Sequence, residues 1–231
     1  MKTLTSATTC LLAALSAPVL LAQDTKTKAE SEKIIRESST VLSEILNAKD
    51  QSIPRDLLSK ARCVGIVPGL KRAGLIVGGE YGKGVVTCQE AGMWSAPSII
   101  RIEGGNIGLQ IGAGETDVVF VIMNQTGMDR LMEDKFTIGA GAAAMAGPVG
   151  RATSAQTDAA LRAEILSYSR SRGVFAGATL NGATMRPDQD DNRALYGREI
   201  TQREILTGKI PVPVAARPLI DTIRRNATPQ G

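Results

Sequence analysis

The apolar residues between Cys63 and Met123 come in short runs that glycines and a proline separate. The runs are rich in valine and isoleucine, a composition typical of β-strands bounded by turns. The connections between them are too short for crossover helices, so we expect mostly antiparallel pairing. This region therefore predicts an α+β fold with a strongly curved, barrel-like sheet. The expected strands are Cys63–Val67, Ala73–Val77, Gly84–Cys88, Ser98–Ile102, Ile107–Ile111 and Asp117–Met123.

A helical pattern precedes these strands. Between Thr27 and Ala48 the apolar residues recur at helical spacing and form a single stripe, which predicts an N-terminal amphipathic helix. The stripe serves either to pack on the sheet or to lie on a membrane surface. Residues 23–36 carry four cations and three acids. That mixture favours packing, because helices that lie on membranes prefer a strongly basic face.

The strongest hairpin signal lies later in the chain. Val174–Leu180 and Ala183–Arg186 flank an Asn-Gly pair, which tolerates the positive φ of a tight two-residue turn. We therefore expect these two segments to pair with each other. A further strand is expected over Glu164–Arg170.

Short helices are expected near the C-terminus. Thr201 and Glu204 have the spacing of a capping box ahead of an apolar pair. Pro211, Pro213 and Pro218 make the following segment extended, up to a last helix around 219–225.

The N-terminal 22 residues resemble a signal peptide. Lys2 gives a positive end, the apolar run Cys10–Leu21 is too short to span a bilayer, and Ala22 offers a cleavage point. The alternative is an uncleaved anchor or a buried helix. We expect residues 23–231 to form a single exported domain, periplasmic or secreted.

Charge is unevenly distributed along the chain. The whole sequence carries 27 lysines and arginines against 23 acids, and residues 192–231 alone hold seven cations and three acids. A local basic excess favours anionic partners such as lipid headgroups, although it also keeps a surface soluble.

The residue types present exclude several kinds of catalysis. The chain has no histidine, so neither a Ser-His-Asp nor a Cys-His arrangement can form. Cys63 and Cys88 fall in neighbouring predicted strands, where they either form a disulfide or remain as buried thiols. Two thiols without histidine cannot make a four-ligand zinc site. We expect a protein that is not an enzyme and needs no cofactor or metal.

One acidic cluster has the spacing of a calcium loop. Asp188, Asp190, Asn192 and Glu199 fall at the first, third, fifth and twelfth positions of such a loop. Arg193 occupies the sixth position, where the sharp turn calls for glycine. The cluster is therefore interpreted as a solvated turn.

Seven motifs occur in order along the chain: GGEYGKGV (Gly78–Val85), GMWSAP (Gly92–Pro97), IGLQIG (Ile107–Gly112), DVVFVIMN (Asp117–Asn124), AGPVGR (Ala146–Arg151), SYSRSRGVFAG (Ser167–Gly177) and Tyr196-Gly197. Together they resemble the SYLF domain family over about residues 31–225. The resemblance implies a domain that binds anionic phospholipids, with phosphoinositides as the ligand of eukaryotic members and export typical of bacterial members. It also implies that an N-terminal amphipathic helix contacts the membrane. Some relatives bind actin, which we do not expect of an exported protein.

The sequence thus predicts peripheral binding of an anionic phospholipid membrane, with no role for nucleic acid. The alternative is an interaction module of the cell envelope that engages a protein partner. The candidate lipid-binding residues come from the N-terminal helix, a glycine-flanked turn and the basic C-terminal stretch: Lys26, Lys28, Lys33, Arg36, Lys71, Arg72, Arg224 and Arg225.

Overall fold

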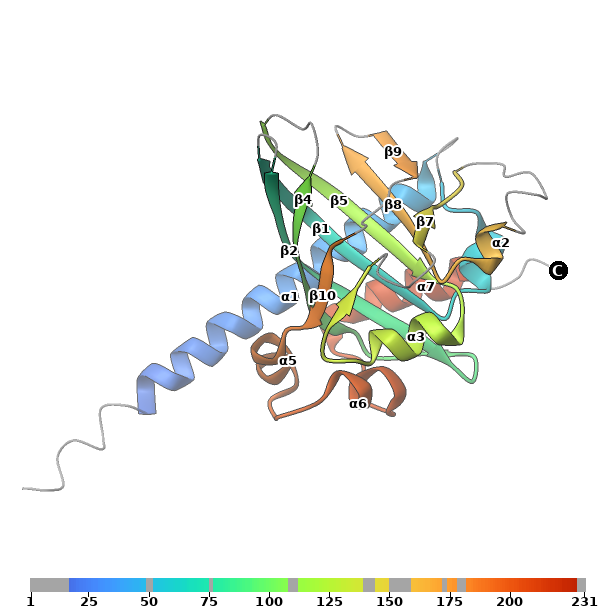
Figure 1. Cartoon of the computed structure of the whole chain (residues 1–231). Coiled ribbons are helices and arrows are strands. Elements are labelled where there is room, and N and C mark those ends of the chain that lie inside the picture. The colour runs from blue at the N-terminus through green and yellow to red at the C-terminus, as the bar shows by residue number, and fades with distance from the viewer. Residues whose placement is uncertain are drawn as a thin grey trace, which may run out of the picture.

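The computed structural model describes residues 17–48, 52–74, 77–107, 112–138, 144–149, 159–171, 174–177 and 182–227 (Figure 1). Its helices are α1 (Ala17–Asn47), α2 (Arg55–Ser59), α3 (Gln125–Leu131), α5 (Gln189–Tyr196), α6 (Gln202–Thr207), the short 3-10 helix η1 (Val214–Ala216) and α7 (Arg217–Ala227). Its strands are β1 (Cys63–Gly74), β2 (Val77–Glu90), β3 (Met93–Trp94), β4 (Ser98–Ile107), β5 (Gly112–Ile122), β6 (Phe136–Thr137), β7 (Ala144–Ala146), β8 (Ile165–Ser171), β9 (Val174–Gly177) and β10 (Thr184–Pro187).

One strongly curved sheet holds these strands together in the order β6-β10-β4-β2-β1-β5-β8-β7, with β3 added to β2 and β9 to β8. All pairs are antiparallel except β7 with β8. The α+β fold with a curved, mostly antiparallel sheet is confirmed, and so are the N-terminal helix and the short C-terminal helices.

The six predicted strands between Cys63 and Met123 are in fact four long ones, β1, β2, β4 and β5, with the two-residue β3 between β2 and β4. The prediction interpreted the glycine pairs as turns, whereas Gly78 and Gly79 lie inside β2, and Gly104 and Gly105 lie inside β4. Gly79 is paired with Gly105 across the two strands. These glycines lie within the paired ends of long strands, so a turn signal in sequence did not mark a turn.

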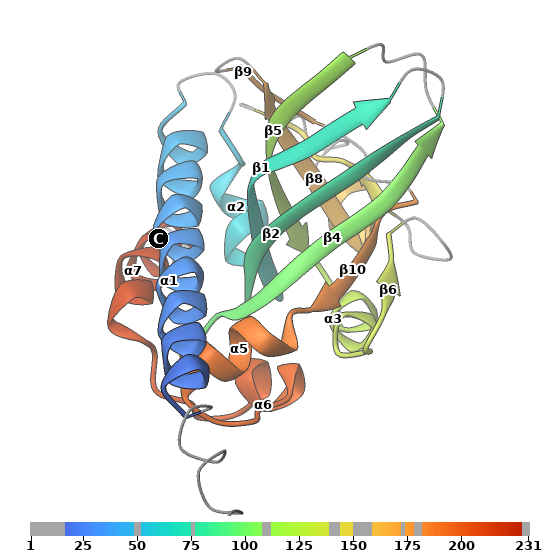
Figure 2. The ribbon, with the colours of Figure 1, turned by 90° about the vertical axis from the view of Figure 1, so that its left-hand side faces the viewer.

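Both faces of the sheet are buried over much of their area. On one face, Val64, Ile66 and Val85 pack with residues of α1, α2 and α7. Figure 2 shows these helices together on that side. On the inner face, Val67 and Phe120 belong to a second cluster that α3 and α6 complete. This arrangement explains the alternation of buried side chains along β1, since successive residues point to opposite faces.

Close packing in the inner cluster depends on Gly65. A Cβ atom at this position would lie 1.8 Å from Cζ of Phe120, a fully buried ring. We expect Gly65→Ala to lower the free energy of unfolding by about 2 kcal/mol, because overpacking a tight core forces side chains off their rotamers. Urea denaturation measures the loss. Phe120→Leu in the same background should recover part of it, and no recovery would contradict this cause.

Cys63 and Cys88 are directly opposite each other on β1 and β2 and form a disulfide. The sequence left a disulfide and two free thiols as alternatives, and the strand register decides between them. The bridge is fully buried in the inner cluster.

The predicted hairpin around Asn181-Gly182 is wrong. Within the described residues, β9 pairs with β8, while β10 pairs with β4 and β6. Gly182 does adopt a positive φ of 90°. The turn signal was therefore real at Gly182, but the strand that follows finds its partners in distant parts of the chain.

The C-terminal helices largely follow the prediction. The Thr201 and Glu204 side chains form the reciprocal capping box at the start of α6. The last helix, α7, is longer than expected and buries Leu219, Ile220 and Ile223. At the other end of the chain, α1 begins at Ala17 instead of Thr27 and continues past Ala22.

Candidate functional site

The apolar stripe of α1 packs against the body of the protein. Ile35, Leu42 and Ile45 are fully buried. The helix contacts β1, β2, α5 and α7. Of the two roles considered for this stripe, core packing is the one observed. Insertion of these side chains into a bilayer would require α1 to leave the sheet.

The charged residues of α1 face outward. Lys33 lies 3.6 Å from Glu37, and Arg36 lies 3.7 Å from Glu32, in each case one helical turn apart. Such exposed pairs contribute only about 0.3–0.5 kcal/mol, so they do not prevent contact with another anion, but they balance the local charge. The predicted contacts that are exposed on this helix are Lys26, Lys28, Lys33 and Arg36.

Lys71 and Arg72 lie near the Gly74 end of β1, whereas α2 precedes the Cys63 end. Lys71 is exposed and lies 3.9 Å from Glu115. Arg72 donates a hydrogen bond of 3.0 Å from Nε to Oε2 of Glu80, whose carboxylate is buried. Arg72 therefore compensates a buried charge. The structure does not bring these two residues together with the basic C-terminal stretch.

The last helix, α7, presents arginines along its outer face. Arg217, Asp221, Arg224 and Arg225 are exposed at helical spacing, opposite the buried face of the helix. Arg224 lies 3.9 Å from Asp221, and Arg225 donates a hydrogen bond to the Thr222 hydroxyl. A helix that is anchored by its apolar side thus displays three arginines and one acid.

A second basic segment lies next to α7. The helix α2 packs against α7, and Figure 1 shows it beside the C-terminal end of that helix. Exposed cations of the α2 segment add to the two arginines near the C-terminal end of α7, against the exposed acids Asp56 and Asp221. We call the group the α2–α7 patch, and its net charge is +3: Arg55, Lys60, Arg62, Arg224 and Arg225.

Two of the five patch residues, Arg224 and Arg225, were predicted from the sequence. The others were missed because Arg55, Lys60 and Arg62 form no charge run of their own. They become part of a patch only because the fold places α2 against α7. A signal for them in the sequence is the spacing of exposed cations around the buried Leu57 and Leu58.

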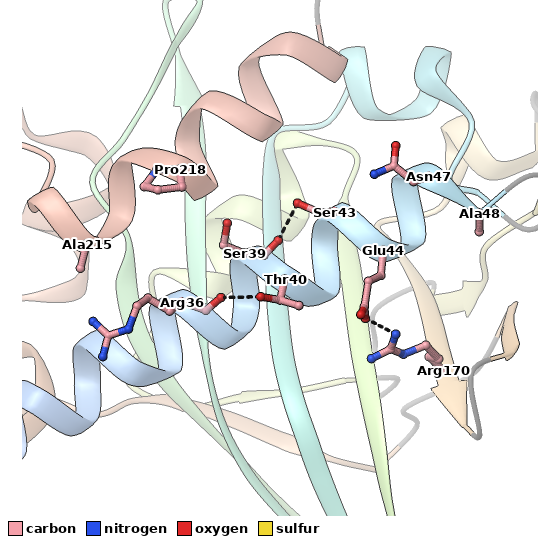
Figure 3. Close-up of a pocket in the computed structure, with 10 residues that line it drawn as sticks. All are labelled: Arg36, Ser39, Thr40, Ser43, Glu44, Asn47, Ala48, Arg170, Ala215 and Pro218. Atoms are coloured by element: carbon pink, nitrogen blue, oxygen red, sulfur yellow. Dashed lines mark hydrogen bonds and ion pairs between the residues drawn. The ribbon is translucent and has the colours of Figure 1, made fainter.

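A shallow pocket of about 720 Å³ runs along the outer side of α1 (Figure 3). Hydroxyl and amide groups of α1 line it, with Arg36 toward one end and Arg170 toward the other. Arg170 donates a 2.8 Å hydrogen bond from Nε to Asp117 and is paired with Glu44. Since two carboxylates compensate Arg170, this pocket does not carry a strong positive charge.

Two acids of the predicted cluster, Asp190 and Glu199, are exposed as expected, but Asp188 is not part of a solvated turn. Asp188 caps α5 by accepting a hydrogen bond from the Asp191 backbone, and both carboxylates are buried. Lys83 of β2 lies 3.0 Å from Asp188 and 2.7 Å from Asp191. The prediction was wrong for Asp188, because Lys83, more than one hundred positions earlier in the chain, lets this acid and Asp191 be buried.

The ionisation of this cluster follows from its burial. Burial alone would lower the pKa of Lys83, but hydrogen bonds from its ammonium group to Asp191 and Asp188 outweigh that effect and raise its pKa. Burial raises the pKa of Asp191, while the hydrogen bond from Lys83 opposes the shift. The cluster joins β2 to α5, and the Ser31 hydroxyl of α1 lies 3.4 Å from the Asp191 carbonyl oxygen.

Within the described residues, no group of three or more His, Cys, Asp or Glu side chains is placed to hold a metal ion. None of the helices in the described part of the chain is long and apolar enough to cross a bilayer.

The profile of the Ysc84 family, described as "Las17-binding protein actin regulator", matches residues 103–226. The chain belongs to this family, which is the one that the SYLF motifs resemble. LAS seventeen-binding protein 3 of Saccharomyces cerevisiae is 35% identical over 182 residues, which make up 77% of this chain and 39% of the yeast protein.

Animal relatives give a similar result. SH3 domain-containing YSC84-like protein 1 of Homo sapiens is 31% identical over 196 residues, which make up 84% of this chain and 56% of the human protein. The chain therefore spans only about two fifths to just over half the length of the curated relatives it matches.

Proposed function

We propose that this protein is a non-enzymatic, peripheral binder of anionic phospholipid membranes in the cell envelope, and that the α2–α7 patch makes the main contact. The observation that supports it most directly is the outer face of α7, where three arginines stand against one acid on a firmly anchored helix. The family resemblance supports the same ligand class.

The mechanism is electrostatic. A lysine or arginine near an anionic surface contributes about 1 kcal/mol, so five cations against two acids provide a useful but salt-sensitive attraction. The apolar stripe of α1 does not add to it, because this stripe is part of the core. Lys26 and Lys28 are exposed in the N-terminal half of α1, whose C-terminal end leads to α2, so they are not part of the α2–α7 patch.

The test removes two arginines of the patch. We expect Arg224→Gln with Arg225→Gln to weaken binding to vesicles that contain phosphatidylglycerol by about 2 kcal/mol, which is roughly 30-fold, because two of the patch cations are lost. Co-sedimentation at low and high salt measures the change. The double variant should also show a shallower salt dependence than the unaltered protein.

A control variant with the same change in net charge is available. Lys71→Gln with Lys135→Gln removes two exposed cations outside the α2–α7 patch. We expect a loss of less than about threefold, since these residues lie outside the proposed contact. Equal losses in the two double variants would refute the patch, and equal binding to neutral and anionic vesicles would refute the electrostatic mechanism.

A second candidate function is binding of a protein partner, and one observation favours it. Met93 keeps 60% of its surface exposed at the rim of a second pocket, of about 650 Å³, between the β3 region and the end of α6. The yeast relative is named for binding LAS seventeen. A protein captured at high salt in the absence of lipid, and lost in Met93→Glu, would favour this function, since apolar interfaces survive screening.

A further inference from the structure

Two arginines face each other on the outer side of the sheet, away from the α2–α7 patch. Arg101 of β4 is directly opposite Arg186 of β10. Their neighbours Ile100, Ile102 and Met185 point into the inner cluster, so both arginines project to the other face. In Figure 2, β4 and β10 lie on the side of α1 opposite to α7. Like charges directly opposite on neighbouring strands destabilise a sheet unless an anion compensates them.

Among the described residues, one carboxylate, that of Glu103, lies within ion-pair distance of these two arginines. The Nε atom of Arg101 lies 3.1 Å from one oxygen of Glu103, and the Nε atom of Arg186 lies 3.9 Å from the other oxygen. Neither contact has hydrogen-bonding geometry, and within the described residues both buried Nε atoms have no acceptor. One carboxylate is thus shared between two guanidinium groups and satisfies neither.

The other charged groups nearby do not complete the compensation. Lys83 of β2 is directly opposite Arg101, so three cations form a row across β10, β4 and β2. Asp188 and Asp191 are both engaged by Lys83. In the next row, the exposed Tyr81 and the Thr184 hydroxyl flank Glu103 on its two neighbouring strands.

We propose that Arg101 and Arg186 form a binding site for a phosphate monoester. The guanidinium groups come from strands about 4.8 Å apart and remain accessible, since 36% and 39% of the two side chains are exposed. A carboxylate has only two oxygens to accept hydrogen bonds from two guanidinium groups, and the two oxygens of Glu103 do not satisfy both. A phosphate monoester has three acceptor oxygens and a higher charge, so it can hydrogen-bond to both guanidinium groups at once. This proposal does not depend on membrane binding by the α2–α7 patch.

The test uses inorganic phosphate and the full chain. Thermal unfolding in phosphate and in chloride at equal ionic strength gives the affinity of the site. We expect Arg101→Gln and Arg186→Gln each to weaken phosphate binding about tenfold, since each removes one guanidinium group and its charge-assisted hydrogen bonds. Glu103→Gln should strengthen phosphate binding several-fold, because the Glu103 carboxylate, which competes with phosphate for the two arginines, loses its charge. Arg224→Gln with Arg225→Gln should leave it unchanged.

The source of the phosphate group is decided with vesicles of phosphatidic acid, a lipid monoester. If the combined Arg101→Gln and Arg186→Gln variant loses binding to them as well, the ligand is a lipid headgroup; if it loses only inorganic phosphate, the ligand is soluble. The proposal is overturned if the unaltered protein responds equally to phosphate and chloride, or if both arginine variants and Glu103→Gln bind phosphate as the unaltered protein does. The Glu103→Gln result stands even if an arginine variant fails to fold.

Discussion

Replacing Lys83 by methionine should lower the free energy of unfolding by about 3 kcal/mol near neutral pH. The substitution leaves the carboxylates of Asp188 and Asp191 without their cation, and these side chains are only 5% and 4% exposed. Removing one partner of a buried ion pair costs several kcal/mol, because the remaining charge stays desolvated. Methionine fills a similar volume, so the expected loss reflects charge more than packing. Urea denaturation measures it.

The size of this loss should depend on pH. Burial raises the pKa of Asp191 above its value in the unfolded chain, so the folded state holds more protons between the two pKa values. Stability therefore falls as pH rises through that window. Lys83 opposes this rise in the pKa of Asp191. Removing Lys83 therefore raises that pKa further and extends to higher pH the range over which stability falls. The deficit of Lys83→Met should be largest at neutral pH and shrink as pH falls toward the ordinary carboxyl range.

A combined variant separates charge from packing. Asp188→Asn and Asp191→Asn, added to Lys83→Met, remove the uncompensated charges and should recover much of the lost stability at neutral pH. The Asn side chain still has an oxygen for the N-cap of α5, so this helix keeps its first hydrogen bond. A deficit that is the same at every pH, and that the combined variant does not reduce, would contradict an electrostatic origin.

Local chemistry in the sequence was a good guide where the structure depends on neighbouring residues. The capping box of Thr201 and Glu204 needs only residues three positions apart, and it forms as expected. The amphipathic stripe of α1 also follows from spacing along one helix. In both cases the sequence pattern that indicates the structure lies within a few turns of the chain, although the stripe of α1 is buried by distant elements.

The same reasoning failed where the partner is distant in sequence. The segment Thr184–Pro187 follows a correct turn residue but pairs with β4, more than 80 positions earlier. Asp188 was judged exposed because Lys83, which compensates it, belongs to β2 and is distant in sequence. Strand pairing and buried charge are decided by the whole fold, so spacing alone could not reveal either of them.

The candidate site shows the same difference between features that neighbouring residues determine and features that depend on distant parts of the chain. The basic excess after residue 192 was visible in composition, and it led to Arg224 and Arg225. The sequence could not show that α2 and the residues that follow it would add three cations beside them, nor that Arg72 would be used to compensate Glu80. Charge in a sequence indicates a class of partner, whereas the packing of helices decides which charges form one surface.

The disulfide between Cys63 and Cys88 gives the second large expected effect. Replacing both cysteines by alanine should lower the free energy of unfolding by about 3 kcal/mol, because the bridge closes a loop with a sequence separation of 25 residues and restricts the unfolded chain. The bridge joins two central strands of the sheet, so its loss acts on the part of the fold that supports α1. Thermal or urea unfolding measures the change.

A reducing agent provides the matched comparison. Dithiothreitol under unfolding conditions should destabilise the unaltered protein by a similar amount and leave the double alanine variant unaffected, because only the former has a bond to reduce. If the variant is as stable as the oxidised protein, the bridge does not restrict the unfolded chain as we infer. If the variant is much less stable than the reduced protein, the additional loss comes from the cavity that the two buried sulfur atoms leave between β1 and β2.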